Sequence, residues 1–248
     1  SEEGLQAWEN YTLELVRHFK DRVKEWEVWN EADHGYNASS GVEYAQLYYN
    51  TATIIRELQP NSKIVALSIA GVGNIDFVVE FFEFLKQKSA IDLVDVVSFH
   101  GYPANPDDGF AAIAKFGELV HSYNPDIELW QGETGCPSTL ETSGALKQHP
   151  WSEKMQAKWN LRRALAHLGR GYPFTQFTIS EYVYSSKLFS GLNGKGLLKI
   201  HPDKSIDYPK PAYFAYQHLT ALLDQEYSLL GKPMYQTRSN YNMSVFGW

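Results

Sequence analysis

The sequence predicts an α/β fold that forms part of a (β/α)8 barrel, the TIM barrel. Helical and strand patterns alternate along the 248 residues. The expected strands are near-continuous apolar runs, such as KIVALSIAG at residues 63–71, and such runs are typical of parallel strands that are covered on both faces. Helices and strands that alternate at this spacing indicate parallel strands joined by right-handed crossovers.

The helices are recognised by apolar residues at helical spacing. The first carries Leu5, Trp8, Tyr11, Leu15 and Phe19, which recur every three or four positions. We expect helices at residues 5–22, 42–58, 75–88, 110–122, 153–168 and 211–223. The strands between them are expected at residues 26–29, 63–71, 93–102, 127–133 and 174–184.

Five strands are fewer than the eight that a closed barrel needs. We therefore expect residues 1–227 to form five-eighths of a barrel that lacks its first three βα units, which a longer polypeptide would supply. Residues 228–248 end on YNMSVFGW, which reads as an unfinished strand and predicts the start of a β-rich C-terminal region. The structural alternative is a five-stranded doubly wound domain. It requires a glycine-rich phosphate loop after its first strand, and NEADHGYNASSG is not such a loop.

Composition excludes several classes of partner. The net charge is −7 and the basic residues form no run, so neither a nucleic acid nor an anionic membrane surface is expected. No apolar segment reaches the roughly 18–20 residues that span a bilayer. The single cysteine, Cys136, excludes an internal disulfide and a multi-cysteine metal site. Neither a metal nor a cofactor is expected, because Asp33-His34, Asp107-Asp108 and His201 lack ligand spacing.

Two glutamates stand at the ends of expected strands. The strand at 26–29 ends in Trp29-Asn30-Glu31, and the strand at 127–133 ends in Gln131-Gly132-Glu133. Catalytic groups of α/β barrels lie at the carboxyl ends of the strands, so these two side chains should face one another across the barrel mouth. Glycosidic cleavage uses two carboxyl groups, one protonated to release the leaving oxygen and one ionised to attack or to activate water.

Polar and aromatic residues accompany both glutamates. Asn30 directly precedes Glu31, His100 and Tyr102 end the strand that lies between the two in sequence, and Trp130 comes three positions before Glu133. Aromatic residues make up 15% of the chain, which suits a cleft that stacks on flat apolar faces and forms hydrogen bonds at its rim.

At these residues the chain resembles a known family. WEVWNEADHGY is similar to the Trp-x-x-Trp-Asn-Glu-Pro motif that ends the fourth strand of clan A glycoside hydrolases, and LWQGETG resembles their seventh-strand segment. FHGY is similar to their sixth strand end. The resemblance is closest in style to families 39, 5 and 42, and it covers the chain as strands four to eight. One departure is Ala32, where the family usually has proline.

The resemblance implies a retaining hydrolase of β-linked glycosides, acting through a covalent glycosyl-enzyme intermediate on an oligo- or polysaccharide. Glu31 would be the acid/base, Glu133 the nucleophile and Asn30 the ligand of the hydroxyl beside the reacting carbon. Tyr102 would donate a hydrogen bond to Glu133, and His100 would line the same subsite.

Retention requires the two carboxyl groups to lie roughly 5–5.5 Å apart with different pKa values. We expect the pKa of Glu31 to be raised by an apolar wall of Trp26 and Trp29 and by its negative neighbour. We expect hydrogen-bond donors to keep the pKa of Glu133 low.

Further candidates end the last expected strand and follow Glu31. Glu181, Tyr182 and Tyr184 occupy a strand end where a barrel of this clan places substrate contacts, although an ion pair or a loop contact would explain Glu181 equally. His34 and Tyr36 lie on the loop after Glu31 and would shape the leaving-group side of the site.

Two other functions remain open from the residues. A carbohydrate-binding barrel without catalysis would keep the stacking residues but would have no use for a paired acid and nucleophile. A metal-dependent barrel enzyme would need ligand sets that the strand ends lack. We expect a secreted or periplasmic protein whose targeting region is not part of this sequence.

Overall fold

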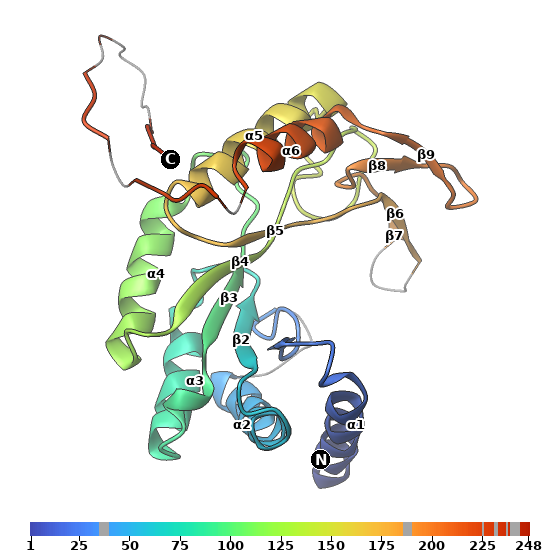
Figure 1. Cartoon of the computed structure of the whole chain (residues 1–248). Coiled ribbons are helices and arrows are strands. Elements are labelled where there is room, and N and C mark those ends of the chain that lie inside the picture. The colour runs from blue at the N-terminus through green and yellow to red at the C-terminus, as the bar shows by residue number, and fades with distance from the viewer. Residues whose placement is uncertain (35–39, 186–189, 225, 231–232, 237, 239–243) are drawn as a thin grey trace. The chain divides into compact units, whose positions relative to one another are not determined.

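The chain divides into two units, whose course Figure 1 traces. The computed structural model describes residues 1–34, 40–185, 190–224, 226–230, 233–236, 238 and 244–248. Unit 1 comprises Ser1–Gly101 and Phe110–Gly132, and unit 2 comprises Tyr102–Gly109 and Glu133–Trp248.

Unit 1 is a parallel sheet with helices between its strands. Its strands are β1 (Glu25–Glu27), β2 (Lys63–Ile69), β3 (Val96–His100) and the first five residues of β4 (Glu128–Thr134). Its helices are α1 (Glu2–Phe19), α2 (Gly41–Leu58), α3 (Ile75–Gln87) and α4 (Phe110–Tyr123), with a 3-10 turn η1 (Ile91–Leu93). β1 pairs with β2 and β2 with β3, in both cases parallel. The order of strands along the sheet therefore follows the order of the sequence, as expected for repeated right-handed crossovers.

Local sequence explains where the first helices of unit 1 begin. The hydroxyl of Ser1 accepts a hydrogen bond from the amide of Gly4, and that of Ser40 accepts one from Glu43. Each satisfies an amide that the first helical turn leaves without a partner. Glu2 strengthens the start of α1, because a negative charge is favourable at the positive end of a helix dipole.

The core of unit 1 is rich in aromatic side chains. Tyr44 and Tyr48 of α2 pack against Phe81 of α3, with ring centroids 5.5 and 5.2 Å apart. The hydroxyl of Tyr44 also donates to the carbonyl of Val28 and accepts from the amide of Leu67. One buried side chain of α2 therefore fixes the end of β1 to β2, and this is the part of the chain that leads to Glu31.

Unit 2 combines two helices with short strands. It contains the last two residues of β4, then α5 (Glu153–Leu168), β5 (Phe174–Gln176), β6 (Tyr182–Ser185), β7 (Ser190–Asn193), β8 (Leu198–Ile200), β9 (Ile206–Pro209) and α6 (Pro211–Leu222). β6 pairs with β7 and β8 with β9, both antiparallel. β5 follows β4 in the sheet order β1-β2-β3-β4-β5, and the amide of Phe177 donates to the carbonyl of Thr134 at 2.8 Å. In Figure 1, α5 and α6 lie side by side.

The predicted strand at 174–184 is wrong as a single element. The strand β5 ends at Gln176, and a separate strand, β6, begins at Tyr182 and belongs to a hairpin. The segment is rich in β-branched and aromatic residues throughout, so its composition favours a strand without showing which neighbour it pairs with. The partners β7, β8 and β9 were not predicted, because Ser190–Asn193 contains a glycine and the other two are only a few residues long.

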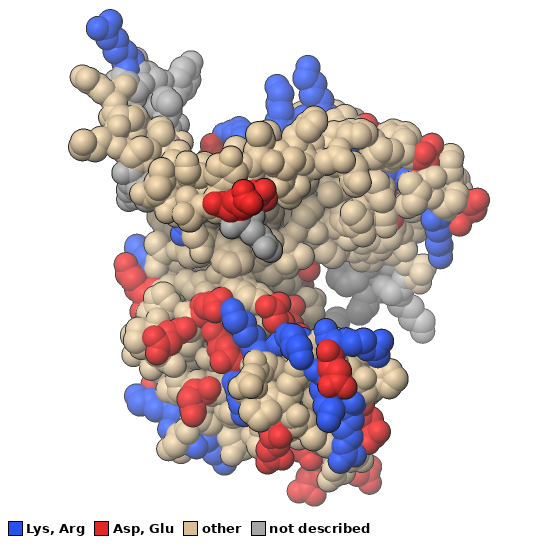
Figure 2. Space-filling model, in the orientation of Figure 1, with Lys and Arg blue, Asp and Glu red and all other residues tan. Residues whose placement is uncertain are grey.

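Charged side chains are mixed on the surface of unit 1. Figure 2 shows basic and acidic groups side by side over the region where Figure 1 draws α1, α2 and α3. Across the described parts of the chain, no helix combines the length and the apolar character needed to cross a bilayer. Among the described residues after Glu226, none is assigned to a helix or a strand.

Candidate active site

Glu31 lies in a tight loop that is tied to the end of β2. Its amide donates to the carbonyl of Ser68 at 2.8 Å, and the carboxylate of Asp33 accepts from the amide of Ala70 at 2.8 Å. Glu31 and Ser68 both have positive φ angles, 47° and 43°, which are uncommon for residues with a side chain. Strained backbone of this kind persists where its surroundings hold it, and it is frequent at functional sites.

β2 contributes to this loop through an irregularity in its pairing. The register between β2 and β3 shifts between Leu67 and Ile69, so one extra residue of β2 bulges out of the ladder. The bulge is what presents the carbonyl of Ser68 to the loop of Glu31. Bulges turn side chains and backbone groups in directions that a regular strand would not allow.

His100 is the direct partner of Glu31. It is the last residue of β3, 4% exposed, and its Nδ1 lies 3.0 Å from Oε1 of Glu31. The hydrogen bond from His100 holds the pKa of Glu31 below its ordinary value, against the opposing effect of partial burial. The expectation that the pKa of Glu31 is raised is therefore wrong.

Trp26 and Trp29, which were expected to form an apolar surface around Glu31, make contacts with other residues. The indole of Trp26 donates to the side chain of Gln59 on α2 at 3.0 Å. Trp29 packs edge-on against Trp8 of α1, with ring centroids 5.2 Å apart, and is 40% exposed. Trp8 and Trp29 border a cavity of about 550 Å³ in unit 1, beside α1 and α2, whose lining does not include Glu31. The hydrogen bond from His100 therefore has the largest influence on the pKa of Glu31.

Two polar neighbours of Glu31 along the chain are exposed, whereas Ala32 is buried. Asn30 and His34 are exposed, and the amide of His34 donates to the carbonyl of Glu31 at 2.9 Å. Asn30 thus remains accessible for the sugar contact expected of it, and His34 lies on the same turn. Tyr36 lies outside the described residues.

Glu133 is the last residue but one of β4 and belongs to unit 2. The hydroxyl of Tyr102 donates a hydrogen bond to its Oε1, as the family resemblance implied. The strand can reach this position because Gly132 precedes it, where a Cβ atom would lie 2.1 Å from the hydroxyl oxygen of Ser98 on β3. A glycine in a strand commonly marks such a close approach.

Tyr182 belongs to a polar cluster with Tyr184, which the sequence analysis also named, and with Asn193, which it did not. Its hydroxyl donates to that of Tyr184 at 2.8 Å, and the amide of Asn193 donates to both hydroxyls at 3.2 and 2.9 Å. Burial raises the pKa of Tyr182 above its ordinary value, and the neighbouring Tyr184 adds to this shift. The buried amide of Asn193 thus holds the two phenol groups together.

Lys195 was missed by sequence reasoning. It is 1% exposed and its Nζ lies 5.4 Å from the centroid of the Tyr102 ring. A lysine in a loop is ordinarily a surface residue. The flanking glycines, Gly194 and Gly196, were the one signal in the sequence that this loop is tightly packed.

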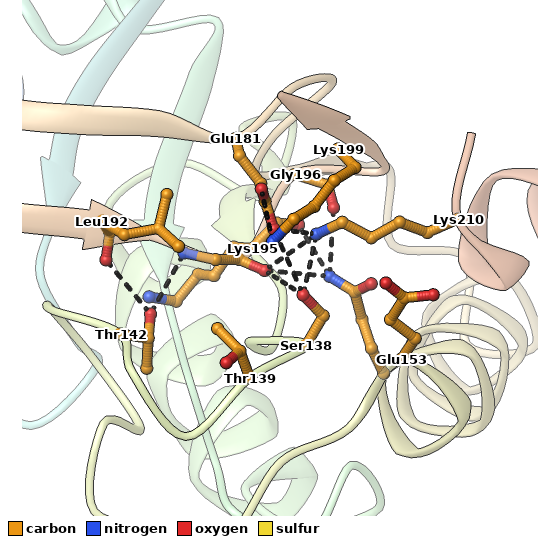
Figure 3. A network of polar contacts seen from close by, with 12 residues as sticks. Ser138, Thr139, Thr142, Glu153, Glu181, Leu192, Lys195, Gly196, Lys199 and Lys210 are labelled. Atoms are coloured by element: carbon orange, nitrogen blue, oxygen red, sulfur yellow. Dashed lines mark hydrogen bonds and ion pairs between the residues drawn. The ribbon is translucent and has the colours of Figure 1, made fainter. Parts of the chain in front are cut away.

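Glu181 lies between β5 and β6, in a buried ion pair. Its Oε1 lies 2.5 Å from Nζ of Lys210 and its Oε2 lies 3.3 Å from Nζ of Lys199, and its side chain is fully buried. Figure 3 shows these groups together with Ser138, whose hydroxyl accepts from Lys210 at 2.8 Å. The carboxylate is therefore occupied by lysines, and the contact with substrate that was expected of it is not supported.

Trp130 makes its contacts at the start of β4, whereas Glu133 lies near the end of the strand. Its indole donates to Glu128, the first residue of β4, and its ring lies under Nζ of Lys63, the first residue of β2. Side chains two positions apart share a face of a strand, so Trp130 joins Glu128 at the strand start. Its expected role in binding substrate finds no support in this placement.

No protein-family model matches the sequence, and no curated protein matches it. The fold is nevertheless similar to many solved structures. A family 39 glycoside hydrolase from Bacteroides cellulosilyticus WH2 has a TM-score of 0.67 and 20% identity over 92% of this chain and 46% of that one. A monomeric β-xylosidase from Caulobacter crescentus CB15 has a TM-score of 0.63 and 21% identity, covering 88% of this chain and 47% of that one.

A β-D-glucuronidase from Dictyoglomus thermophilum also has a TM-score of 0.63, with 14% identity over 89% of this chain and 36% of that one. The chain thus spans less than half the length of these three structures. At such low identity the likeness concerns the fold. It shows that this chain has the mixed α/β fold of glycoside hydrolases.

Proposed function

We propose that the chain carries the catalytic residues of a retaining glycoside hydrolase that acts on β-linked glycosides. Glu133 is the nucleophile and Glu31 the acid/base. The hydrogen bond from Tyr102 to Glu133 is the observation that carries the proposal. A donor aimed at a carboxylate favours its ionised form, and a nucleophilic carboxylate must be ionised before it attacks.

The proposed reaction has two displacements. In the first, a carboxylate oxygen of Glu133 bonds to the anomeric carbon while Glu31 gives its proton to the departing oxygen of the leaving group. In the second, Glu31 takes a proton from water, whose oxygen bonds to the anomeric carbon and releases Glu133. Two inversions at one carbon give net retention.

The family resemblance and the fold neighbours support the same reaction class. They also support the assignment of β1–β5 to strands four to eight of a (β/α)8 barrel, in which the carboxyl ends of the strands carry the chemistry. Asn30 follows β1 and is accessible to bind the hydroxyl next to the reacting carbon. His100 and Tyr102 orient the two glutamates, each through one hydrogen bond.

The activities named for the structural neighbours indicate which substrates to test first. Since they include a β-xylosidase and a β-glucuronidase, the first substrates to test are aryl β-xylosides and aryl β-glucuronides. Turnover of any aryl β-glycoside, followed by NMR at early times, should release the β-anomer first. An α-anomer at early times would show inversion and would exclude Glu133 as nucleophile.

Covalent trapping provides a second test. A 2-fluoro glycoside with a good leaving group should accumulate as a glycosyl-enzyme, and peptide mass spectrometry should find the added mass on Glu133. Saturable binding of a sugar without turnover or labelling would instead identify a carbohydrate-binding barrel.

A further inference from the structure

The loop that carries Lys195 is held rigidly from three sides. The side-chain amide of Gln156 donates to the carbonyls of Cys136, Lys195 and Gly196 at 3.0, 3.0 and 3.2 Å. The amide of Ser138 donates to the carbonyl of Gly194 at 3.0 Å. Figure 3 shows this loop beside the Glu181–Lys210 ion pair.

The packing leaves the loop little freedom to move. A Cβ atom at Gly196 would lie 1.9 Å from the amide nitrogen of Glu181, so no side chain fits there. Lys210 adds a hydrogen bond to the carbonyl of Gly194 at 3.3 Å. A lysine side chain is ordinarily flexible because it has several rotatable bonds. Here the backbone that carries the side chain of Lys195 is held in place.

The ammonium of Lys195 lies at the face of Tyr102. Its Nζ is 5.4 Å from the ring centroid, within the range of a cation–π contact. Tyr102 is the same residue whose hydroxyl donates to Glu133. The three side chains therefore form a chain of contacts from the ammonium to the phenol and from the phenol to the carboxylate.

Burial of this ammonium is unfavourable by itself. Desolvation lowers the pKa of Lys195 to about 8, and the charge of Glu133 opposes the shift. Burial also raises the pKa of the Cys136 thiol, so this group is neutral in the physiological range. A Cβ atom at Gly144 would lie 3.4 Å from Nζ of Lys195 and 3.8 Å from the hydroxyl of Tyr184, so a second phenol borders the same space. Among the described groups around Lys195, Glu133 is the one whose negative charge is stabilised by the ammonium.

We infer that Lys195 is a positioning residue for Glu133, which favours the ionised carboxylate both by its own charge and by polarising Tyr102. A cation over an aromatic ring draws electron density from it, and a phenol depleted in this way is a stronger hydrogen-bond donor. A stronger donor stabilises a carboxylate more than a carboxylic acid. This inference rests on the proposed role of Glu133 as nucleophile, and its test does not depend on turnover.

The experiment is a titration of Glu133 by carbon-13 NMR in the full chain labelled at the glutamate side-chain carboxyl carbon. Glu133→Gln identifies the resonance by its loss. Lys195→Met, which keeps the length of the side chain without its charge, should raise the pKa of Glu133 by about one unit, a change typical of a lost neighbouring charge. Lys154→Met, which removes an exposed lysine of α5, is the matched control and should leave the resonance unchanged.

The route through Tyr102 is tested by a double-mutant cycle. In a Tyr102→Phe background, Lys195→Met should shift the pKa of Glu133 by a smaller amount, because the polarised hydroxyl is gone and only the direct attraction between the two charges remains. An undiminished shift in that background would overturn the role of Tyr102. An unchanged titration in Lys195→Met itself would overturn the proposal as a whole.

A reciprocal measurement covers the case in which Lys195→Met does not fold. Linkage requires that a charge on Glu133 favours the charge on Lys195 to the same extent. Nitrogen-15 NMR of the lysine ammonium groups should therefore show a lower pKa for Lys195 in Glu133→Gln than in the natural sequence. Equal values in the two proteins would also overturn the inference.

Kinetics then separate this role from recognition of an acidic sugar. If Lys195 acts on Glu133, Lys195→Met moves the acidic limb of kcat/KM to higher pH for an aryl β-xyloside and an aryl β-glucuronide alike. A loss confined to the glucuronide, with Glu133 titrating normally, would mean that Lys195 binds a substrate carboxylate instead. Absence of turnover on every substrate would count against the proposed function, while the NMR result would stand on its own.

Discussion

Nδ1 of the buried His100 lies 3.0 Å from Oε1 of Glu31, and this contact sets the acidity of the proposed acid/base. The hydrogen bond favours the carboxylate, so it makes Glu31 a stronger acid that keeps its proton only at low pH. β3 supplies the histidine and the loop after β1 supplies the glutamate, which are 69 residues apart in sequence.

Replacing His100 should therefore change the pH profile. Removal of the imidazole in His100→Ala lets the pKa of Glu31 rise toward its ordinary value. Glu31 acts as an acid below its pKa, so the alkaline limb of kcat/KM should move to higher pH for substrates with poor leaving groups. A limb that stays in place, or moves to lower pH, would contradict the assignment of Glu31 as the acid.

Glu31→Gln should separate substrates by their leaving groups. Glutamine cannot give a proton, so turnover of alkyl or sugar leaving groups should fall by roughly 10²–10⁴-fold, the range for loss of a general acid. Activated aryl glycosides leave without protonation and should lose much less in the first step. The check is a plot of log kcat/KM against leaving-group pKa, which should become steeper in the variant. Equal losses on all substrates would indicate that Glu31 has another role.

Glu133→Gln should abolish turnover of both kinds of substrate. An amide oxygen does not form the glycosyl-enzyme, and no other group replaces the nucleophile. Trapping with a 2-fluoro glycoside should also disappear. The conservative control is Tyr102→Phe, which keeps the carboxylate but removes the hydroxyl of Tyr102 that donates to it, and it should retain measurable labelling at a reduced rate. Full activity in Glu133→Gln would reject the mechanism.

Lys210→Met should destabilise the protein strongly. Both side chains of the Glu181–Lys210 pair are fully buried, so removal of the lysine leaves a carboxylate in a place where its remaining ammonium partner is Lys199 at 3.3 Å. Breaking a buried pair typically costs about 3–5 kcal/mol. Urea unfolding followed by circular dichroism measures the loss.

Two further variants show whether the stability lost in Lys210→Met comes from the unpaired buried charge. Glu181→Leu combined with Lys210→Met removes both charges and should be more stable than Lys210→Met alone. Lys63→Met breaks the pair with Glu128, whose side chains are 42% and 46% exposed, and it should change the free energy of unfolding by less than about 1 kcal/mol. If Lys210→Met proved as mild as Lys63→Met, the buried pair would not support the loop of Lys195.

The sequence by itself determined the alternation of helices and strands and the placement of one glutamate in β4 and another shortly after β1. Both follow from short-range patterns. Apolar residues at helical spacing predicted α2 to within one residue of its observed start, and the apolar run before Glu133 predicted β4. The partnership of Tyr102 with Glu133 was implied by the family resemblance.

Only the tertiary structure decided which charges meet. Lys195 and Lys210 lie in segments whose sequences resemble ordinary surface loops, and both side chains are fully buried or nearly so. Glu181 looked like a strand-end ligand and is a member of an ion pair, and His100 reversed the expected shift in the pKa of Glu31. The physical reason is that periodicity records which face of an element is apolar, whereas a pKa or an ion pair depends on groups that approach from distant segments. Burial and the identity of the nearest charge are properties of the folded chain.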